Sequence, residues 1–213
     1  MYTGSSPRSP SPYLFSQKEV RDILIAWVAL AAAFTIAYSG GISGGVSLIA
    51  GGFPYLFVVA FIAVGSGFVL HELMHKFTAE RYGYWAEFRM WVMGIVLALI
   101  TSTLGFIFAA PGATYIQGNN VSDRQNGIIS VAGPATNVCL AILFLLVGNV
   151  GITNGLVDDI SFVGYNVNLF LALFNLLPVM PLDGAKVFRW NKVIWIMFFG
   201  PLALIFLYGI GLV

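Results

Sequence analysis

The amino-acid sequence predicts an all-α polytopic membrane protein with about five to six transmembrane helices. Of its 213 residues, 59% are hydrophobic and only 9% are charged, and the mean hydropathy is +0.89. A soluble domain of this length carries about a quarter charged residues, so much of this chain's outer surface is suited to lipid. The second observation is a series of apolar runs of near-spanning length, at about 23–38, 54–75, 90–110, 128–150, 160–180 and 193–213.

The polar segment 1–19 is rich in Ser, Pro and Gly, and we expect it to be a disordered cytoplasmic N-terminus. Residues 20–213 leave no room for an aqueous domain, and we expect them to form a single membrane-embedded domain. An uncharged glycine-rich segment, 40–52, follows the first apolar run and is either a flexible flap or a linker. The net charge of +1 argues against a basic surface of the kind that binds nucleic acid.

The basic residues decide how the third apolar run, 90–110, is arranged. All ten Lys and Arg lie before the first run, after the second, between the third and fourth, or before the last. If every run crossed the membrane once, the basic segment 186–192 would lie outside and the acidic pair Asp158 and Asp159 inside, against the positive-inside bias. If 90–110 makes no net crossing, all ten lie on the cytoplasmic side. We therefore expect a re-entrant or extended membrane-embedded segment near 90–116 that is covered by protein or lines a cavity.

The second run ends in the motif His71-Glu72-Leu73-Met74-His75, which contains both histidines of the chain. Residues four apart share one face of a helix, so both imidazoles can bind one cation. Glu72 lies about 100° further round the helix, where it can act as a general base on water without binding the metal. Two imidazoles and a carboxylate leave zinc an open position for water. We expect one Zn²⁺ per chain, with His71 and His75 as ligands.

A third ligand is needed, and Asp183 is the best-placed carboxylate. It lies in the segment NLLPVMPLDG at 175–184, where two prolines end the helix and Gly184 allows a tight turn. Asp183 shares a membrane face with the histidines only if 90–110 makes no net crossing, which is the arrangement that the charges favour. An Asp-Gly turn at a helix end is the purely structural alternative, and Glu87 is the alternative ligand.

Three motifs occur in order along the chain: HExxH at 71–75, a GPATN element at 133–137, and the NxxPxxPxDG pattern at 175–184. In these motifs the chain resembles the site-2 protease family of intramembrane zinc metalloproteases (peptidase family M50). The resemblance covers the family's catalytic core, about 54–190 here, and implies that Asp183 is the third zinc ligand. It also implies extended, membrane-embedded strands after the HExxH helix, where this chain has a helix-length apolar stretch, 90–104.

The expected function is hydrolysis of peptide bonds in or near transmembrane segments of membrane-anchored substrates, as in regulated intramembrane proteolysis. Zinc would polarise the scissile carbonyl while Glu72 moves a proton from water to the leaving amine. An extended edge at 106–116 would hold the unwound substrate by strand addition. Asn137 and Asn175 either contact the substrate or its oxyanion, or form hydrogen bonds between helices.

We expect a multi-pass protein of the cell membrane whose active site lies toward the cytoplasmic side. The expected partners are the lipid bilayer and a membrane-anchored protein substrate. A different class of function would use the same ligands without hydrolysis, in a metal transporter or a metal-stabilised scaffold. A transporter would show ionisable residues along several helices, whereas here they cluster at one end of two helices.

Overall fold

The computed structural model describes residues 15–41, 52–107, 111–118, 120–150 and 155–209. Within them, five helices are long and apolar enough to cross a membrane: α1 (Gln17–Tyr38), α3 (Phe53–Arg81), α5 (Asp123–Asn149), α6 (Gly155–Asn175) and α8 (Lys192–Gly209). Two shorter helices, α4 (Val92–Ser102) and α7 (Asp183–Trp190), and two strands, β1 (Trp85–Met90) and β2 (Gly112–Gln117), lie between them. The predicted all-α polytopic membrane architecture is confirmed.

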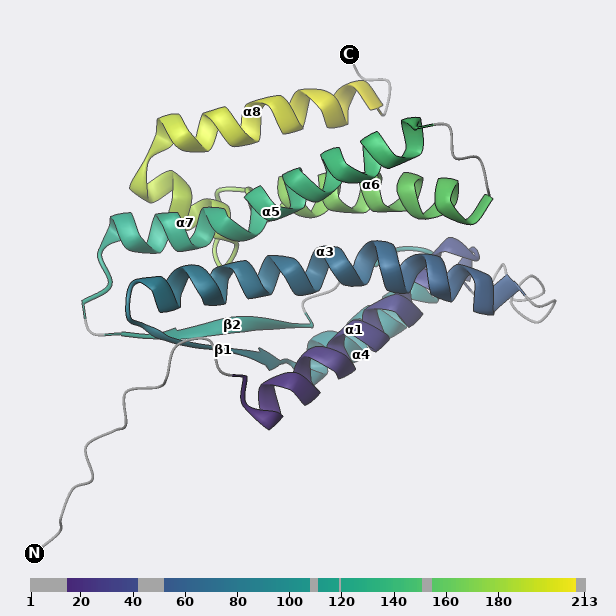
Figure 1. Ribbon diagram of the computed structural model, residues 1–213, viewed down its shortest axis with the longest axis horizontal. Coiled ribbons are helices and arrows are strands. Elements are labelled where there is room, and N and C mark those ends of the chain that lie inside the picture. Colours follow the sequence, from purple (N-terminus) through teal and green to yellow (C-terminus); the bar gives the residue numbers. More distant parts are fainter. Residues whose placement is uncertain (1–14, 42–51, 108–110, 119, 151–154, 210–213) are drawn as a thin grey trace, which may run out of the picture.

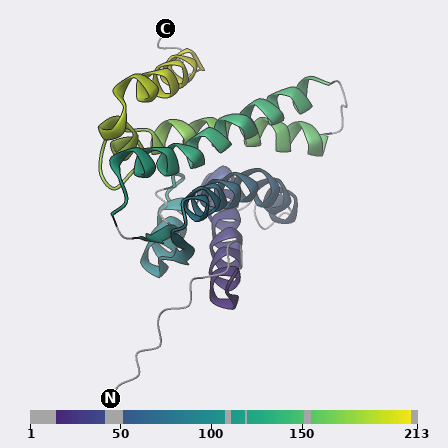
Figure 2. The ribbon, with the colours of Figure 1, turned by 60° about the vertical axis from the view of Figure 1, so that its left-hand side comes forward.

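The elements form layers around α3 (Figure 1). Helices α1 and α4 and the two strands cover one side of α3, α5 and α6 cover the other, and α8 lies outermost. Figure 2 shows α5 and α6 side by side, with α8 diverging from them. Helix α3 has 29 residues and is about 44 Å long. It lies between the two layers and contacts both of them.

The contact between α1 and α3 depends on small residues of α3. The Trp27 ring stacks on Phe61 with 4.6 Å between ring centroids, and its Nε1 donates to the Phe61 carbonyl at 2.8 Å. A Cβ atom at Gly65 would lie 1.6 Å from that same nitrogen. Ala60 and Ala63 are likewise buried against α1 and α6. Such close approach is the usual way in which membrane helices gain packing energy.

The N-terminal boundary differs from the expected one. Helix α1 begins at Gln17, because the side chain of Ser16 caps it by accepting from the Glu19 amide at 3.1 Å. The last three residues of the segment 1–19 are therefore helical, and the side chain of Glu19 is fully buried. Residues 1–14 lie outside the described part of the chain, as does most of the glycine-rich segment.

The segment 85–117 leaves from the end of α3 and returns to it. Strands β1 and β2 pair antiparallel, from Trp85 opposite Gln117 to Met90 opposite Gly112. Helix α4, with 11 residues, rises about 16 Å, roughly half of the hydrocarbon core. The segment therefore makes no net crossing, and the predicted re-entrant arrangement is confirmed. The extended edge expected at 106–116 is a strand over Gly112–Gln117, and 108–110 lie outside the described residues.

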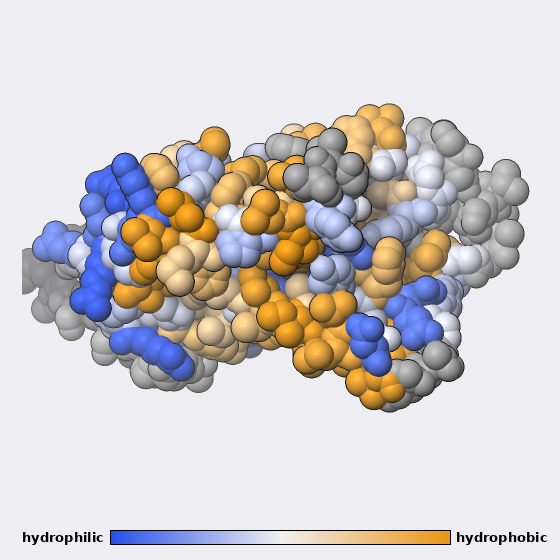
Figure 3. Space-filling model, turned by 90° about the horizontal axis from the view of Figure 1, so that it is seen from above, coloured by the Kyte–Doolittle hydropathy of each residue, from blue (hydrophilic) through white to orange (hydrophobic). Residues whose placement is uncertain are grey.

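The molecular surface matches a membrane setting. Figure 3 shows a mainly hydrophobic middle, with strongly hydrophilic residues gathered at the left-hand end and a smaller group at the right. Helix α8 exposes large apolar side chains, including Ile196, Met197 and Leu204. Exposed apolar surface of this extent is suited to contact with lipid.

Candidate metal centre

The two histidines lie side by side on α3, one turn apart, as their spacing predicts. Both are buried, with exposed fractions of 6% for His71 and 7% for His75. Their Nε2 atoms are 3.0 Å apart, and their rings meet edge to face. Each ring is thus positioned to direct its Nε2 atom at the same point.

Asp183 approaches that point from the far end of the 175–184 segment. Helix α6 ends at Asn175, and α7 begins at Asp183. A Cβ atom at Gly184 would lie 2.1 Å from the Leu176 carbonyl oxygen, so only glycine permits this close approach of α7 to the end of α6. The result places Asp183 Oδ2 3.0 Å from His75 Nε2 and 3.4 Å from His71 Nε2.

Hydrogen bonds to the other ring nitrogens fix the histidine tautomers. His71 Nδ1 lies 2.6 Å from Asn137 Oδ1, and His75 Nδ1 lies 2.7 Å from the Ile129 carbonyl oxygen. Since the Ile129 oxygen can only accept, His75 Nδ1 carries the hydrogen. The Asn137 amide donates through its nitrogen elsewhere, so its oxygen accepts from His71 Nδ1. Both Nε2 atoms therefore present lone pairs to the shared point.

This set of donors fits a zinc ion. One ligand atom each from His71, His75 and Asp183 lie within 4.8 Å of one another. Tetrahedral zinc with bonds of about 2.0–2.1 Å separates its ligand atoms by about 3.3 Å, close to the distances found here. Two lone pairs and a carboxylate facing one another at this range repel unless a proton or a metal cation lies between them, and the set of donors suits the metal cation. Three protein ligands also leave a fourth position open for water.

Asn137 connects the centre to α6. Its Nδ2 donates to the Gly67 carbonyl at 3.1 Å and to Asn168 Oδ1 at 2.8 Å, and Asn168 Nδ2 in turn donates to the Gly164 carbonyl at 2.8 Å. Asn137 and Asn168 are fully buried. All polar groups of the Asn137 side chain are thus engaged in holding His71 and joining α3, α5 and α6.

Gly133, one turn before Asn137 on α5, packs directly on the imidazoles. A Cβ atom there would lie 2.4 Å from His75 Nε2 and 2.6 Å from His71 Nε2. The missing side chain leaves space between the two nitrogens, where the ion would need it. The GPATN element therefore serves the centre twice, through Gly133 and through Asn137.

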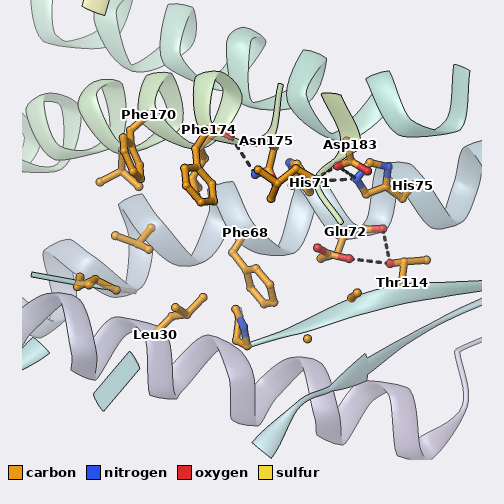
Figure 4. Close-up of a pocket in the computed structure, with 18 of the residues that line it drawn as sticks. Leu30, Phe68, His71, Glu72, His75, Thr114, Phe170, Phe174, Asn175 and Asp183 are labelled. Carbon is orange, nitrogen blue, oxygen red and sulfur yellow. Dashed lines mark hydrogen bonds and ion pairs between the residues drawn. The ribbon is translucent and has the colours of Figure 1, made fainter. Parts of the chain in front are cut away.

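Glu72 extends from α3 toward β2. Thr114 Oγ1 lies 2.9 Å from Glu72 Oε2 and 3.1 Å from the Glu72 carbonyl oxygen (Figure 4). Among the described residues, the ligand atoms that converge belong to His71, His75 and Asp183, and Glu72 is not one of this group. It lies beside the centre, where a general base is needed.

The centre opens into a cavity of about 1090 Å³. Figure 4 shows Leu30 of α1, Phe68 of α3 and the rings of Phe170 and Phe174 on α6 around it, with His71, Glu72 and Asp183 at one end. Residues 112–116 of β2 and 180–183 complete that end. A largely apolar cavity with a few polar groups gathered at one end is typical of a site that binds an apolar segment.

The structure brings some of the residues predicted from the sequence together at the metal centre and places others elsewhere. His71, His75 and Asp183 converge, and Glu72 lies beside them. Asn175 lines the cavity and donates to the Leu171 carbonyl at 2.9 Å. The other residues lie elsewhere: Asn137 is behind His71 rather than in the cavity, in the helix-to-helix role that the sequence left open, and Glu87 lies on β1 with Arg89 as its ion-pair partner.

Sequence reasoning did not find two residues of the site, Thr114 and Asn168, and it named Gly133 as part of the GPATN element without assigning it a role. Asn168 gave a signal, because it is an amide within an apolar run, where polar side chains usually have partners. Thr114 gave none, since its partner Glu72 is 42 residues away along the chain.

Comparisons with known proteins agree with this geometry. The model of Peptidase family M50 matches residues 59–163, which include the HExxH and GPATN motifs but not Asp183. A Methanocaldococcus jannaschii protein, provisionally named zinc metalloprotease MJ0611, is 42% identical over 87% of this chain and 91% of its own. Rip2 of Mycolicibacterium smegmatis, also provisionally named a zinc metalloprotease, is 33% identical over 62% of this chain and 58% of its own. No solved structure matches the chain significantly.

The first of these relatives is matched over nearly its whole length, and the names of both imply zinc. Five apolar helices make the chain an integral membrane protein. The chain therefore belongs to peptidase family M50 and is a membrane metalloprotease of the site-2 protease type.

Proposed function

We propose that the chain is an intramembrane zinc endopeptidase that cleaves membrane-anchored proteins in or near their transmembrane segments. The observation that carries the proposal is the convergence of His71, His75 and Asp183 beside Glu72, at one end of a large apolar cavity. We assign one Zn²⁺ per chain to the three ligands. When bound, zinc would polarise the scissile carbonyl and acidify water.

In the proposed reaction Glu72 takes a proton from the attacking water as its oxygen adds to the carbonyl carbon. The same carboxyl group then gives the proton to the amide nitrogen as the C–N bond breaks. The products are a carboxylic acid and a free amine, and Glu72 returns to its starting state. His71 and His75 keep their tautomers throughout, because Asn137 and the Ile129 carbonyl hold their Nδ1 hydrogens.

A transmembrane helix hides its peptide groups in internal hydrogen bonds, so it must unwind before cleavage. Strand β2 supports the proposal that the unwound segment binds by strand addition, because residues 112–116 line the cavity next to Glu72. Apolar side chains of the segment would occupy the part of the cavity around Phe170 and Phe174. Asn175 lines the cavity and is proposed to contact the substrate.

We place the active site toward the cytoplasmic side of the cell membrane. The end of the molecule that carries it also carries the basic segment 186–192 and the start of α5 with Arg124. Positive residues are retained on the cytoplasmic side. The alternative of metal transport is less well supported, since among the described residues the ligand atoms belong to a single cluster rather than to a path.

The test combines metal analysis with a cleavage assay in proteoliposomes. Wild type, Glu72→Gln, Asp183→Ala and the control Asp123→Ala, whose side chain is 60% exposed on α5, are purified and assayed for zinc and for cleavage of a membrane-tethered peptide. Glu72→Gln should keep zinc and lose cleavage, Asp183→Ala should lose both, and the control should lose neither. Cleavage by Glu72→Gln would refute the mechanism, and full zinc in Asp183→Ala would refute the third ligand.

A further inference from the structure

Thr114, the third residue of β2, contacts Glu72 twice. Its hydroxyl lies 2.9 Å from the carboxylate oxygen Oε2 and 3.1 Å from the carbonyl oxygen of the same residue (Figure 4). The side chain thus bridges β2 and the catalytic helix at the level of the metal centre. Among the described residues, no other group donates to the Glu72 carboxylate, so Oε1 is the oxygen left for water.

The backbone of Thr114 points in a second direction, which the pairing of the strands reveals. On β1, the Phe88 amide donates to Glu19 Oε1 at 3.0 Å, and the Ala86 carbonyl accepts from Lys76 Nζ at 2.9 Å. Both groups therefore point away from β2. In an antiparallel pair, residues opposite each other turn their polar groups together, either toward or away from the partner strand.

Thr114 lies opposite Phe88 in this register. Its N–H and C=O groups consequently point away from β1, to the outer edge of β2, as do those of Gly112 and Ile116. All three residues line the cavity. The outer edge of β1, by contrast, is covered by the side chains of Glu19 and Lys76, so the edge of β2 is the one suited to an added strand.

We propose that Thr114 is a positioning residue that ties the substrate-binding edge to the general base. Its peptide groups bind the substrate strand, while its hydroxyl holds Glu72 Oε2 and thereby directs Oε1 at the reacting water. A free Glu side chain samples many rotamers and loses conformational entropy when it is fixed in one of them. If Thr114 already holds Glu72, this entropy loss is not added to the free-energy barrier of the reaction step. This inference rests on the proposed role of Glu72 and adds to it a coupling between substrate and base.

The experiment compares Thr114→Val, which keeps the shape and the β-branch but loses the hydroxyl, with Thr114→Ser, which keeps the hydroxyl. Thr35→Val on α1 is the matched control, because the Thr35 hydroxyl donates to the Ala31 carbonyl of its own helix at 2.7 Å and Thr35 is not among the residues that line the cavity. Each is assayed in proteoliposomes with the membrane-tethered peptide that the wild type cleaves, and zinc content is measured.

We expect Thr114→Val to retain zinc and KM and to lower kcat by about tenfold or more, a part of what a positioned general base contributes. Thr114→Ser should stay within about threefold of wild type, and Thr35→Val should not differ from it. Wild-type kcat in Thr114→Val, a rise in KM alone, loss of zinc, or failure of serine to rescue would each overturn the inference.

Glu72→Gln in the same assay separates this inference from the proposed function. If Glu72→Gln is inactive while Thr114→Val is fully active, the proposed function stands and the coupling is wrong. If Glu72→Gln cleaves the peptide, the proposed function fails and the role of Thr114 fails with it.

Discussion

Each histidine ring of the metal centre is held at the nitrogen that does not face the ion. For His71 the partner is the amide of Asn137, and for His75 it is a helix carbonyl. A substitution can remove the side-chain acceptor of Asn137, whereas it cannot remove the backbone carbonyl that holds His75. Asn137 therefore offers a direct way to measure how much the hydrogen bond to a histidine Nδ1 contributes to zinc affinity.

We expect Asn137→Leu to weaken zinc binding by about 10- to 100-fold, as is usual when the partner of a ligating histidine is removed. The His71 ring then loses both its orientation and the acceptor that fixes its tautomer. The control is Asn149→Leu on the same helix, because Asn149 is exposed and its amide donates to the Leu145 carbonyl of its own helix. Competition with a zinc chelator gives both affinities, and equal values for the two variants would contradict the assignment.

Gly133→Ala tests the space between the imidazoles. The added methyl would lie within about 2.6 Å of both Nε2 atoms, so we expect the purified variant to contain little zinc and to be inactive. Gly200→Ala in α8, where a Cβ meets nothing within 4 Å, should keep both. Metal analysis is the readout, and a fully zinc-loaded Gly133→Ala would show that α5 can move away.

At this scale the sequence predicted the residues with short-range signals. The spacing of His71 and His75 predicts that both lie on one face of a helix. The two prolines before Asp183 and the glycine after it predict a turn that presents the Asp183 carboxylate. The hydroxyl of Thr114 and the amide of Asn168 could not be placed, because their partners lie 42 and 31 residues away along the chain. Only tertiary packing brings those pairs together.

At the scale of elements, a buried ion pair fastens α1 to α3 and β1. Lys76 Nζ lies 2.9 Å from Glu19 Oε2 and 3.2 Å from Glu80 Oε1, and the Lys76 and Glu19 side chains are 1% and 0% exposed. Breaking a buried pair by removing one partner leaves an uncompensated charge. The pair also covers the outer edge of β1, so its loss would affect the strands as well as the helices.

We expect Lys76→Met to lower the free energy of unfolding in detergent micelles by roughly 3–5 kcal/mol, since Glu19 stays buried without its cation. Arg189→Met should cost at most about 1 kcal/mol, because both side chains of its pair with Asp123 are exposed, Arg189 by 76% and Asp123 by 60%. The double variant Glu19→Gln with Lys76→Met should recover part of the loss. Equal effects of the two single variants, measured by denaturant titration, would disprove this account.

The re-entrant segment shows where prediction from sequence stops at this scale. The charge distribution indicated that 90–110 does not cross, but hydropathy alone joined α4 and the residues after it into one apolar run and did not identify the strand β1 that precedes it. The strand Trp85–Met90 contains Glu87 and Arg89 and lacks a clean alternation of apolar residues. Its extended form depends on pairing with β2 and on the Glu19 and Lys76 side chains, which the local sequence does not reveal.

At the scale of the whole molecule, the five helices of the described residues that are long and apolar enough to cross a membrane would place the two ends of the described chain on opposite sides of it. Helices α3 and α6 end on the same side, and this is what allows His75 and Asp183 to meet. The orientation of that side is the remaining part of the topology to be measured.

Accessibility labelling of single cysteines tests the orientation. In a Cys139→Ser background, cysteines are placed at positions 45, 120, 155 and 188, and intact cells are treated with a membrane-impermeant thiol reagent. We expect 45 and 155 to react and 120 and 188 to react only after the cells are opened. Reaction of 188 in intact cells, with 155 protected, would place the site on the outer side.

The outward-facing peptide groups of β2 also bear on how water reaches the reaction. Backbone N–H and C=O groups without partners are costly in hydrocarbon. Since no hydrogen bond within the described residues joins the outer edge of β2 at Gly112, Thr114 and Ile116 to another segment, we expect water to hydrate this edge whenever no substrate strand is bound. Water along this edge would lie next to Glu72 and the metal ligands. The strand that we propose to receive the peptide would therefore also hold the second reactant of the hydrolysis beside the general base.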